Sequence, residues 1–124
     1  MYTILVVEDE FQIEKILKEF LTRMGFKVIT IPDGERAIEV LNSALKIDLM
    51  LLDMKMPKVG GFDVLKQMKK INRRHPVIIL TGSLDEKEYI DNVETLGYSA
   101  QDILSKPVDL FLLLGIIKNK LGIV

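Results

Sequence analysis

Four short apolar runs in this chain each end at, or one residue before, a charged or hydroxyl-bearing residue. The residues at which the runs end are Glu8 and Asp9, Asp53, Thr81 and Lys106. Apolar runs without polar alternation are typical of parallel strands that are covered on both faces. Parallel strands have their carboxyl ends at one edge of the sheet, where open α/β sheets bind ligands. These side chains are therefore expected to meet in one site.

Helical patterns alternate with apolar runs along all 124 residues. Helices are predicted at about residues 13–24, 37–44, 64–71, 90–96 and 109–121, the last with Asp109 as its N-cap. Strands are predicted at about residues 4–7, 28–31, 49–52, 77–80 and 101–104. Five βα units are too few for an eight-unit barrel of about 250 residues. The sequence therefore predicts an α/β doubly wound parallel sheet that forms a single domain over residues 1–124.

Charge and cysteine content narrow the classes of function. The formal net charge of -1 lacks the positive excess of nucleic-acid-binding proteins, so no direct nucleic-acid contact is expected. A local basic run at residues 66–74 is interpreted as a solvated helix end. The absence of cysteine excludes disulfides and suits a reducing cytoplasm. No signal peptide or bilayer-spanning run of roughly 20 apolar residues is found, so a cytoplasmic protein without membrane insertion is expected.

The carboxylates of Glu8, Asp9 and Asp53 indicate a metal site. Two carboxylates about 5 Å apart repel each other by roughly 3 kcal/mol at an effective dielectric constant near 20. Such a cluster therefore requires a cation or takes up protons. Hard oxygen ligands with open positions favour Mg²⁺, or Mn²⁺ in its place. One of the three carboxylates is then available as a nucleophile that forms an aspartyl-phosphate.

The other strand-end groups are suited to bind a phosphoryl group. Its equatorial oxygens need donors, and Lys106 offers an ammonium, Thr81 a hydroxyl and Gly82 a backbone N–H. Taken singly, Asp9 is equally suited to cap a helix, and Thr81 fits a turn. Asp53 is different, because an unpaired charge at the end of a buried strand is costly. It is the spacing of the whole set that predicts in-line phosphoryl transfer.

The order of these motifs resembles the receiver domain of bacterial two-component response regulators, over about residues 2–121. The motifs are residues 4–9, residues 51–57 with Gly61, Thr81 with Gly82, and Lys106 with Pro107. The resemblance implies a flavodoxin-like fold with five helices around a five-stranded parallel sheet in the order 2-1-3-4-5. It also implies a cis peptide bond before Pro107, which is an option open to proline.

The resemblance assigns roles to the residues of the acidic cluster. Asp53 resembles the phosphoacceptor of the family. Glu8, Asp9 and the Asp53 carboxylate, together with the backbone carbonyl of Lys55, resemble the Mg²⁺ ligands. A receiver with this complete set would accept its phosphoryl group from a sensor histidine kinase or a histidine phosphotransfer protein.

The resemblance also assigns the residues that would respond to phosphorylation. Thr81 resembles the switch hydroxyl, and Lys106 resembles the lysine that contacts the phosphoryl group. Three residues before that lysine, the family often has Tyr or Phe coupled to the hydroxyl. Ile103 occupies this position, so a switch in this chain would use a smaller aliphatic side chain.

Three classes of function are open at this point. The first is a signalling phosphoacceptor rather than an enzyme, in which transfer to Asp53 changes contacts with a downstream protein target. The second is a Mg²⁺-dependent phosphohydrolase, but such enzymes usually have an Asp two residues after the nucleophile, where this chain has Lys55. The third is a binding module that acts without phosphorylation. The complete acidic set favours the first class.

The last predicted helix has more apolar residues than a core stripe requires. The residues that complete a stripe are Leu110, Leu114, Ile117 and Leu121. The additional ones are Leu112, Leu113 and Ile116. Since exposed apolar surface often marks an interface, we predict a partner or homodimer contact at these three residues, with deep packing into the core as the alternative. Phe11, close after the acidic pair, is a second candidate. It would either pack near the start of the helix or contact the kinase, and the resemblance favours the kinase contact.

Overall fold

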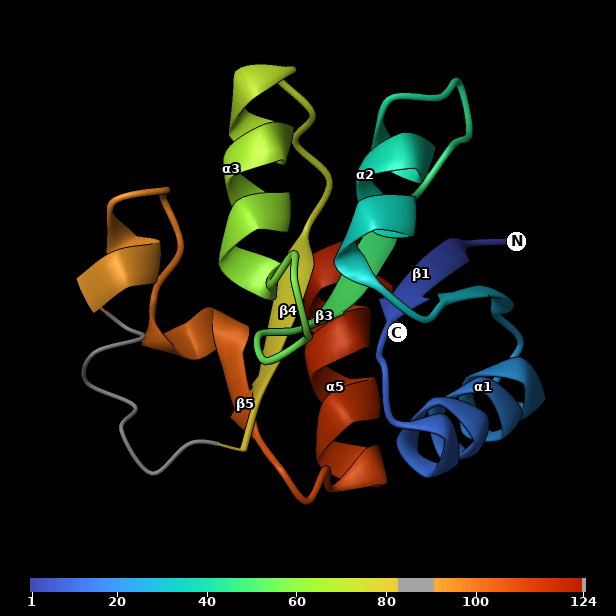
Figure 1. Ribbon diagram of the computed structural model, residues 1–124. Coiled ribbons are helices and arrows are strands. Elements are labelled where there is room, and N and C mark those ends of the chain that lie inside the picture. The colour runs from blue at the N-terminus through green and yellow to red at the C-terminus, as the bar shows by residue number, and fades with distance from the viewer. Residues whose placement is uncertain (83–90, 124) are drawn as a thin grey trace.

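The computed structural model describes residues 1–82 and 91–123, which form a parallel sheet with helices on both faces (Figure 1). The strands are β1 (Thr3–Val7), β2 (Lys27–Ile31), β3 (Leu49–Asp53), β4 (Val77–Thr81) and β5 (Ile103–Ser105). The helices are α1 (Phe11–Arg23), α2 (Gly34–Leu41), α3 (Gly61–Lys70) and α5 (Leu110–Leu121). Residues 91–94 are also helical, while residue 90 of the predicted fourth helix lies outside the described residues. The strand order is β2-β1-β3-β4-β5, which confirms the order that the resemblance implied.

Two apolar cores cover the two faces of the sheet. Successive strand residues point to opposite faces. Leu5 and Val7 therefore pack in the core under α2 and α3, whereas Ile4 and Val6 pack in the core under α1 and α5. Every residue of β3 and β4 is buried. A strand covered on both faces has no solvent-facing position, which explains the lack of polar alternation in these two segments.

The fifth strand begins later than predicted. Residues Ala100–Asp102 form a 3-10 turn, and β5 starts at Ile103. The Ser99 hydroxyl accepts a hydrogen bond from the backbone N–H of Gln101, which stabilises the turn in place of a strand. A serine that caps local backbone in this way competes with strand pairing.

Side-chain caps fix the start of two helices. The Asp33 carboxylate accepts a hydrogen bond from the backbone N–H of Arg36, so α2 begins at Gly34. Asp109 accepts hydrogen bonds from two backbone N–H groups of α5, which confirms it as the predicted N-cap. The N-cap of α1 is Glu10 rather than Asp9, and its side chain makes no capping hydrogen bond.

The inner face of α5 corrects one predicted interface residue. Leu113 is fully buried together with Ile117, so it belongs to the core and not to a contact surface. Leu112 is 53% exposed and Ile116 is half-buried. Because α5 has apolar residues on nearly all sides, the sequence pattern does not show which side faces the sheet.

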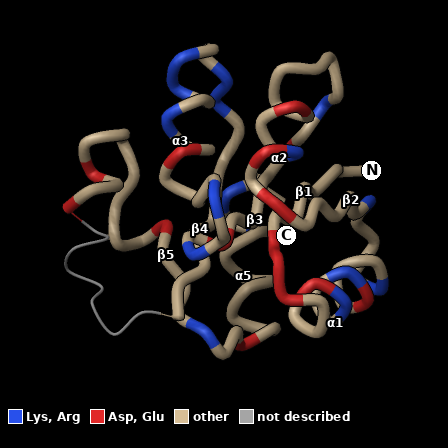
Figure 2. The backbone as a smooth tube through the Cα atoms, viewed as in Figure 1, with Lys and Arg blue, Asp and Glu red and all other residues tan. Residues whose placement is uncertain are grey.

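The basic run lies at the C-terminal end of α3, where Figure 2 shows a concentration of positive residues. Lys69 and Lys70 are exposed in the last turn, as predicted for a solvated helix end. Arg73 differs, because it is half-buried and donates hydrogen bonds to backbone carbonyls at and after the C-terminal end of α2, including that of Leu41 at 2.7 Å. It therefore satisfies carbonyl groups at the end of another helix. Within the described residues, each helix is too short or too polar to cross a membrane.

Candidate functional site

The strand register brings the predicted residues to one edge of the sheet. The pairing of β1 with β3 ends at Val7, so Glu8 follows one strand where Asp53 ends its neighbour. Thr81 is the last residue of β4, and Lys106 follows β5 directly. The site is therefore built from the ends of four adjacent strands, as expected for a doubly wound sheet.

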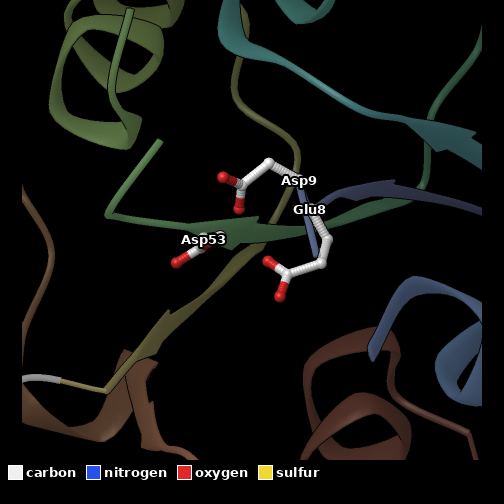
Figure 3. Close-up of side chains that lie close together, drawn as sticks. All are labelled: Glu8, Asp9 and Asp53. Carbon is white, nitrogen blue, oxygen red and sulfur yellow. The ribbon is translucent and has the colours of Figure 1, made fainter. Parts of the chain in front are cut away.

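The three carboxylates lie close together at this edge, with Glu8 and Asp9 from the end of β1 facing Asp53 from β3 (Figure 3). One oxygen of each lies within 4.8 Å of the others. Glu8 and Asp53 are buried, and Asp9 is exposed. The Oε2 atom of Glu8 is buried without a hydrogen-bond partner, which is costly for a carboxylate. A hard divalent cation bound by these oxygens would remove that cost, so the residues fit a metal such as Mg²⁺.

Lys106 supplies the ammonium group of the site. Its Nζ atom lies 2.8 Å from Oε1 of Glu8 and 3.4 Å from Oδ2 of Asp53. It also lies 3.6 Å from Oε1 of Glu10, a residue that the sequence did not single out. The Lys106 side chain is only 13% exposed. The largely buried Lys106 ammonium therefore forms ion pairs with three carboxylates.

Thr81 and Gly82 lie beside the lysine. The backbone carbonyl of Thr81 accepts a hydrogen bond from the backbone N–H of Lys106 at 2.8 Å, which ties the end of β4 to the segment after β5. Thr81 is almost completely buried. A Cβ atom at Gly82 would lie 3.8 Å from Cδ of Lys106, an ordinary van der Waals distance. The peptide bond between Lys106 and Pro107 is cis, as the resemblance implied.

Burial and repulsion shift the pKa values in this cluster. Burial, reinforced by the nearby Asp53, raises the pKa of Glu8 to about 8, although Lys106 opposes the shift. Burial and the Asp53 carboxylate also raise the pKa of Asp9. Burial disfavours the Lys106 ammonium, but its hydrogen bond to Glu8 and the neighbouring carboxylates raise its pKa overall. The site therefore holds more negative charge than one lysine compensates.

The remaining predicted residues lie around this cluster. The backbone N–H of Lys55 donates a hydrogen bond to Oδ1 of Asp53 at 3.2 Å, so the loop after β3 folds back toward that carboxylate. Ile103 is half-buried and pairs with β4. Phe11 is 72% exposed in the first turn of α1. The contact of Glu10 with Lys106 was not predicted from the sequence. A third acidic residue before a helix does not indicate which basic residue it will contact.

Comparisons with known proteins agree with this geometry. The family model for the response regulator receiver domain matches residues 4–118. The transcriptional regulatory protein CpxR of Escherichia coli strain K12 is 42% identical over 107 residues, which cover 86% of this chain and 44% of CpxR. A response regulator receiver domain protein from Clostridium thermocellum superposes with a TM-score of 0.85 at 32% identity, covering 98% of this chain and 95% of that one. The BeF3-activated DrrB receiver domain has a TM-score of 0.81 at 28% identity and 98% coverage of both chains.

The chain therefore belongs to the response regulator receiver domain family, whose members are phosphoacceptors in two-component signalling. Response regulators receive their phosphoryl groups from histidine kinases, and receivers generally bind Mg²⁺ at an acidic pocket. The chain spans less than half the length of CpxR.

Proposed function

We propose that Asp53 is the residue of this receiver that accepts the phosphoryl group. The observation that carries the proposal is the cluster of Glu8, Asp9 and Asp53 oxygens within 4.8 Å of one another, with Glu8 Oε2 lacking a hydrogen-bond partner. These carboxylates and the Lys55 backbone carbonyl are the proposed Mg²⁺ ligands. In support of this role, Asp53 ends a fully buried strand and is itself buried beside Glu8.

The proposed reaction is an in-line transfer from a phosphohistidine to the Asp53 carboxylate. A new bond forms between a carboxylate oxygen and phosphorus while the phosphorus–nitrogen bond breaks. The electron pair of that bond stays with the imidazole, which then takes up a proton. Bound Mg²⁺ would neutralise part of the charge on the transferred oxygens. Lys106, 3.4 Å from Asp53, and Thr81 at the end of β4 are the proposed donors to the other oxygens.

The proposed phosphoryl donor is a sensor histidine kinase or a histidine phosphotransfer protein. We propose that residues 1–124 form one receiver domain and that the transfer takes place in the cytoplasm. Exposed Phe11 is the proposed kinase contact, and Leu112 with Ile116 is the proposed contact for a downstream protein or a second copy. Lys55 stands where an aspartyl-phosphate phosphohydrolase would have its second Asp, so we propose a phosphoacceptor and not a turnover enzyme.

Phosphorylation by acetyl phosphate tests this proposal without knowledge of the kinase. With excess Mg²⁺, intact-mass spectrometry is expected to show one added phosphoryl group per chain. With EDTA in place of Mg²⁺, the three carboxylates repel the anionic donor, and incorporation is expected to fall at least about a hundred-fold. Equal incorporation with Mg²⁺ and with EDTA, or none in either, would contradict the proposed site.

A further inference from the structure

Glu10 contacts Lys106 from outside the proposed set of metal ligands. The Lys106 ammonium lies 2.8 Å from Glu8, 3.4 Å from Asp53 and 3.6 Å from Glu10. The Glu8 and Asp53 side chains are at most 3% exposed, whereas that of Glu10 is 62% exposed. Lys106 is thus shared between two buried carboxylates and one that faces water.

A phosphoryl group on Asp53 needs the same ammonium. A phosphoryl group of this kind carries up to about two negative charges. The Lys106 ammonium donates a hydrogen bond to Glu8, whereas Glu10, at 3.6 Å, is an ion-pair partner beyond hydrogen-bond distance. The contact of Lys106 with Asp53 would pass to the phosphoryl group that Asp53 carries. Of the three carboxylates, Glu10 is then the one that attracts the lysine away from the phosphoryl group, and water solvates it when the contact is lost.

We propose that Glu10 is a positioning residue that competes with the phosphoryl group for Lys106. The inference rests on the proposed role of Asp53 as phosphoacceptor. Glu10 belongs to neither the proposed metal ligands nor the proposed phosphoryl donors, and it acts through the lysine alone. It sets how firmly Lys106 holds a phosphoryl group while it adds negative charge at the edge of the metal site.

Replacement of Glu10 by Gln is expected to tighten beryllofluoride binding without tightening Mg²⁺ binding. Loss of a negative charge near the acidic cluster leaves Mg²⁺ binding unchanged or weakens it by up to about three-fold. Loss of the competitor tightens binding of beryllofluoride, a tetrahedral analogue of the phosphoryl group, by about three-fold at saturating Mg²⁺. Damage to the fold would instead weaken both.

The test uses calorimetric titrations of wild type, Glu10→Gln and the control Glu19→Gln. Glu19 is exposed on α1, the helix that follows Glu10, so its replacement gives the same change in net charge without the contact to Lys106. Each protein is titrated with Mg²⁺ alone and then with beryllofluoride at saturating Mg²⁺. Tighter beryllofluoride binding in Glu10→Gln alone, without tighter Mg²⁺ binding, supports the proposal.

Any other pattern in proteins that bind beryllofluoride would overturn the role of Glu10. Equal beryllofluoride affinity in Glu10→Gln and Glu19→Gln would show that the contact to Lys106 has no effect. A joint loss of Mg²⁺ and beryllofluoride binding would show that Glu10 is needed for the structure of the site. If wild type itself binds no beryllofluoride, the proposed phosphoacceptor fails instead, so the two failures are distinguishable.

Discussion

Asp53→Asn is expected to reduce phosphorylation by acetyl phosphate at least about a thousand-fold, to background. The amide has nearly the shape of the carboxylate, but its nitrogen and oxygen are poor nucleophiles toward phosphorus. The change also replaces one of the three clustered carboxylates with a neutral amide, which weakens the proposed metal site. The measurement is the time course of phosphate incorporation at saturating Mg²⁺, followed by intact-mass spectrometry.

A matched control separates the nucleophile from a general effect of charge. Glu39→Gln makes the same kind of replacement at an exposed position of α2 and is expected to be phosphorylated at the wild-type rate. Circular dichroism of Asp53→Asn is expected to show an intact fold, because neutralising one carboxylate relieves repulsion within the cluster. Incorporation by Asp53→Asn at the wild-type rate would place the acceptor on another residue.

Gly61→Ala is expected to lower the free energy of unfolding by about 3 kcal/mol, at the upper end of the cost of overpacking. A Cβ atom at this position would lie 2.6 Å from the backbone oxygen of Asp53 and 2.8 Å from the sulfur of Met54. The Gly61 backbone N–H also donates a hydrogen bond to the Met54 carbonyl at 3.2 Å. A methyl group would therefore force the first turn of α3 away from the loop that follows Asp53.

The measurement is thermal unfolding of the wild type, of Gly61→Ala and of the control variant Gly115→Ala. A Cβ atom at Gly115 meets no atom within 4 Å, and the residue is exposed within α5. Alanine there is expected to raise the stability by up to about 1 kcal/mol through its higher helix propensity. Gly61→Ala is expected to lower the melting temperature by about 10 °C. If both variants unfold at or above the wild-type temperature, the close packing against Asp53 is not a constraint.

Much of the fold could be predicted because the strands have a simple physical signature. Segments such as β3 and β4 are buried on both faces, so their unbroken apolar runs mark central parallel strands. Each run ends where the backbone reaches the edge of the sheet, and the polar residue at that point is a candidate for the site. The strand order came from the resemblance, since hydrophobic pattern alone does not specify which strands are neighbours.

Two features could not be predicted for opposite reasons. The sides of α5 are so uniformly apolar that the pattern did not distinguish buried Leu113 from exposed Leu112. The contact of Glu10 with Lys106 joins residues 96 positions apart in the chain, and only the strand register brings them together. Local sequence patterns report burial along one element, but they carry little information on polar contacts between elements.

The most direct test of the account is the location of the phosphoryl group itself. Borohydride reduces an aspartyl-phosphate to homoserine, so it marks the acceptor permanently. After treatment with acetyl phosphate and Mg²⁺, tryptic peptides are sequenced by tandem mass spectrometry, which distinguishes Asp53 from Asp48 in the peptide of residues 47–55. Homoserine is expected at position 53 alone. Reduction at Asp9 or Glu8 with position 53 unmodified would contradict it.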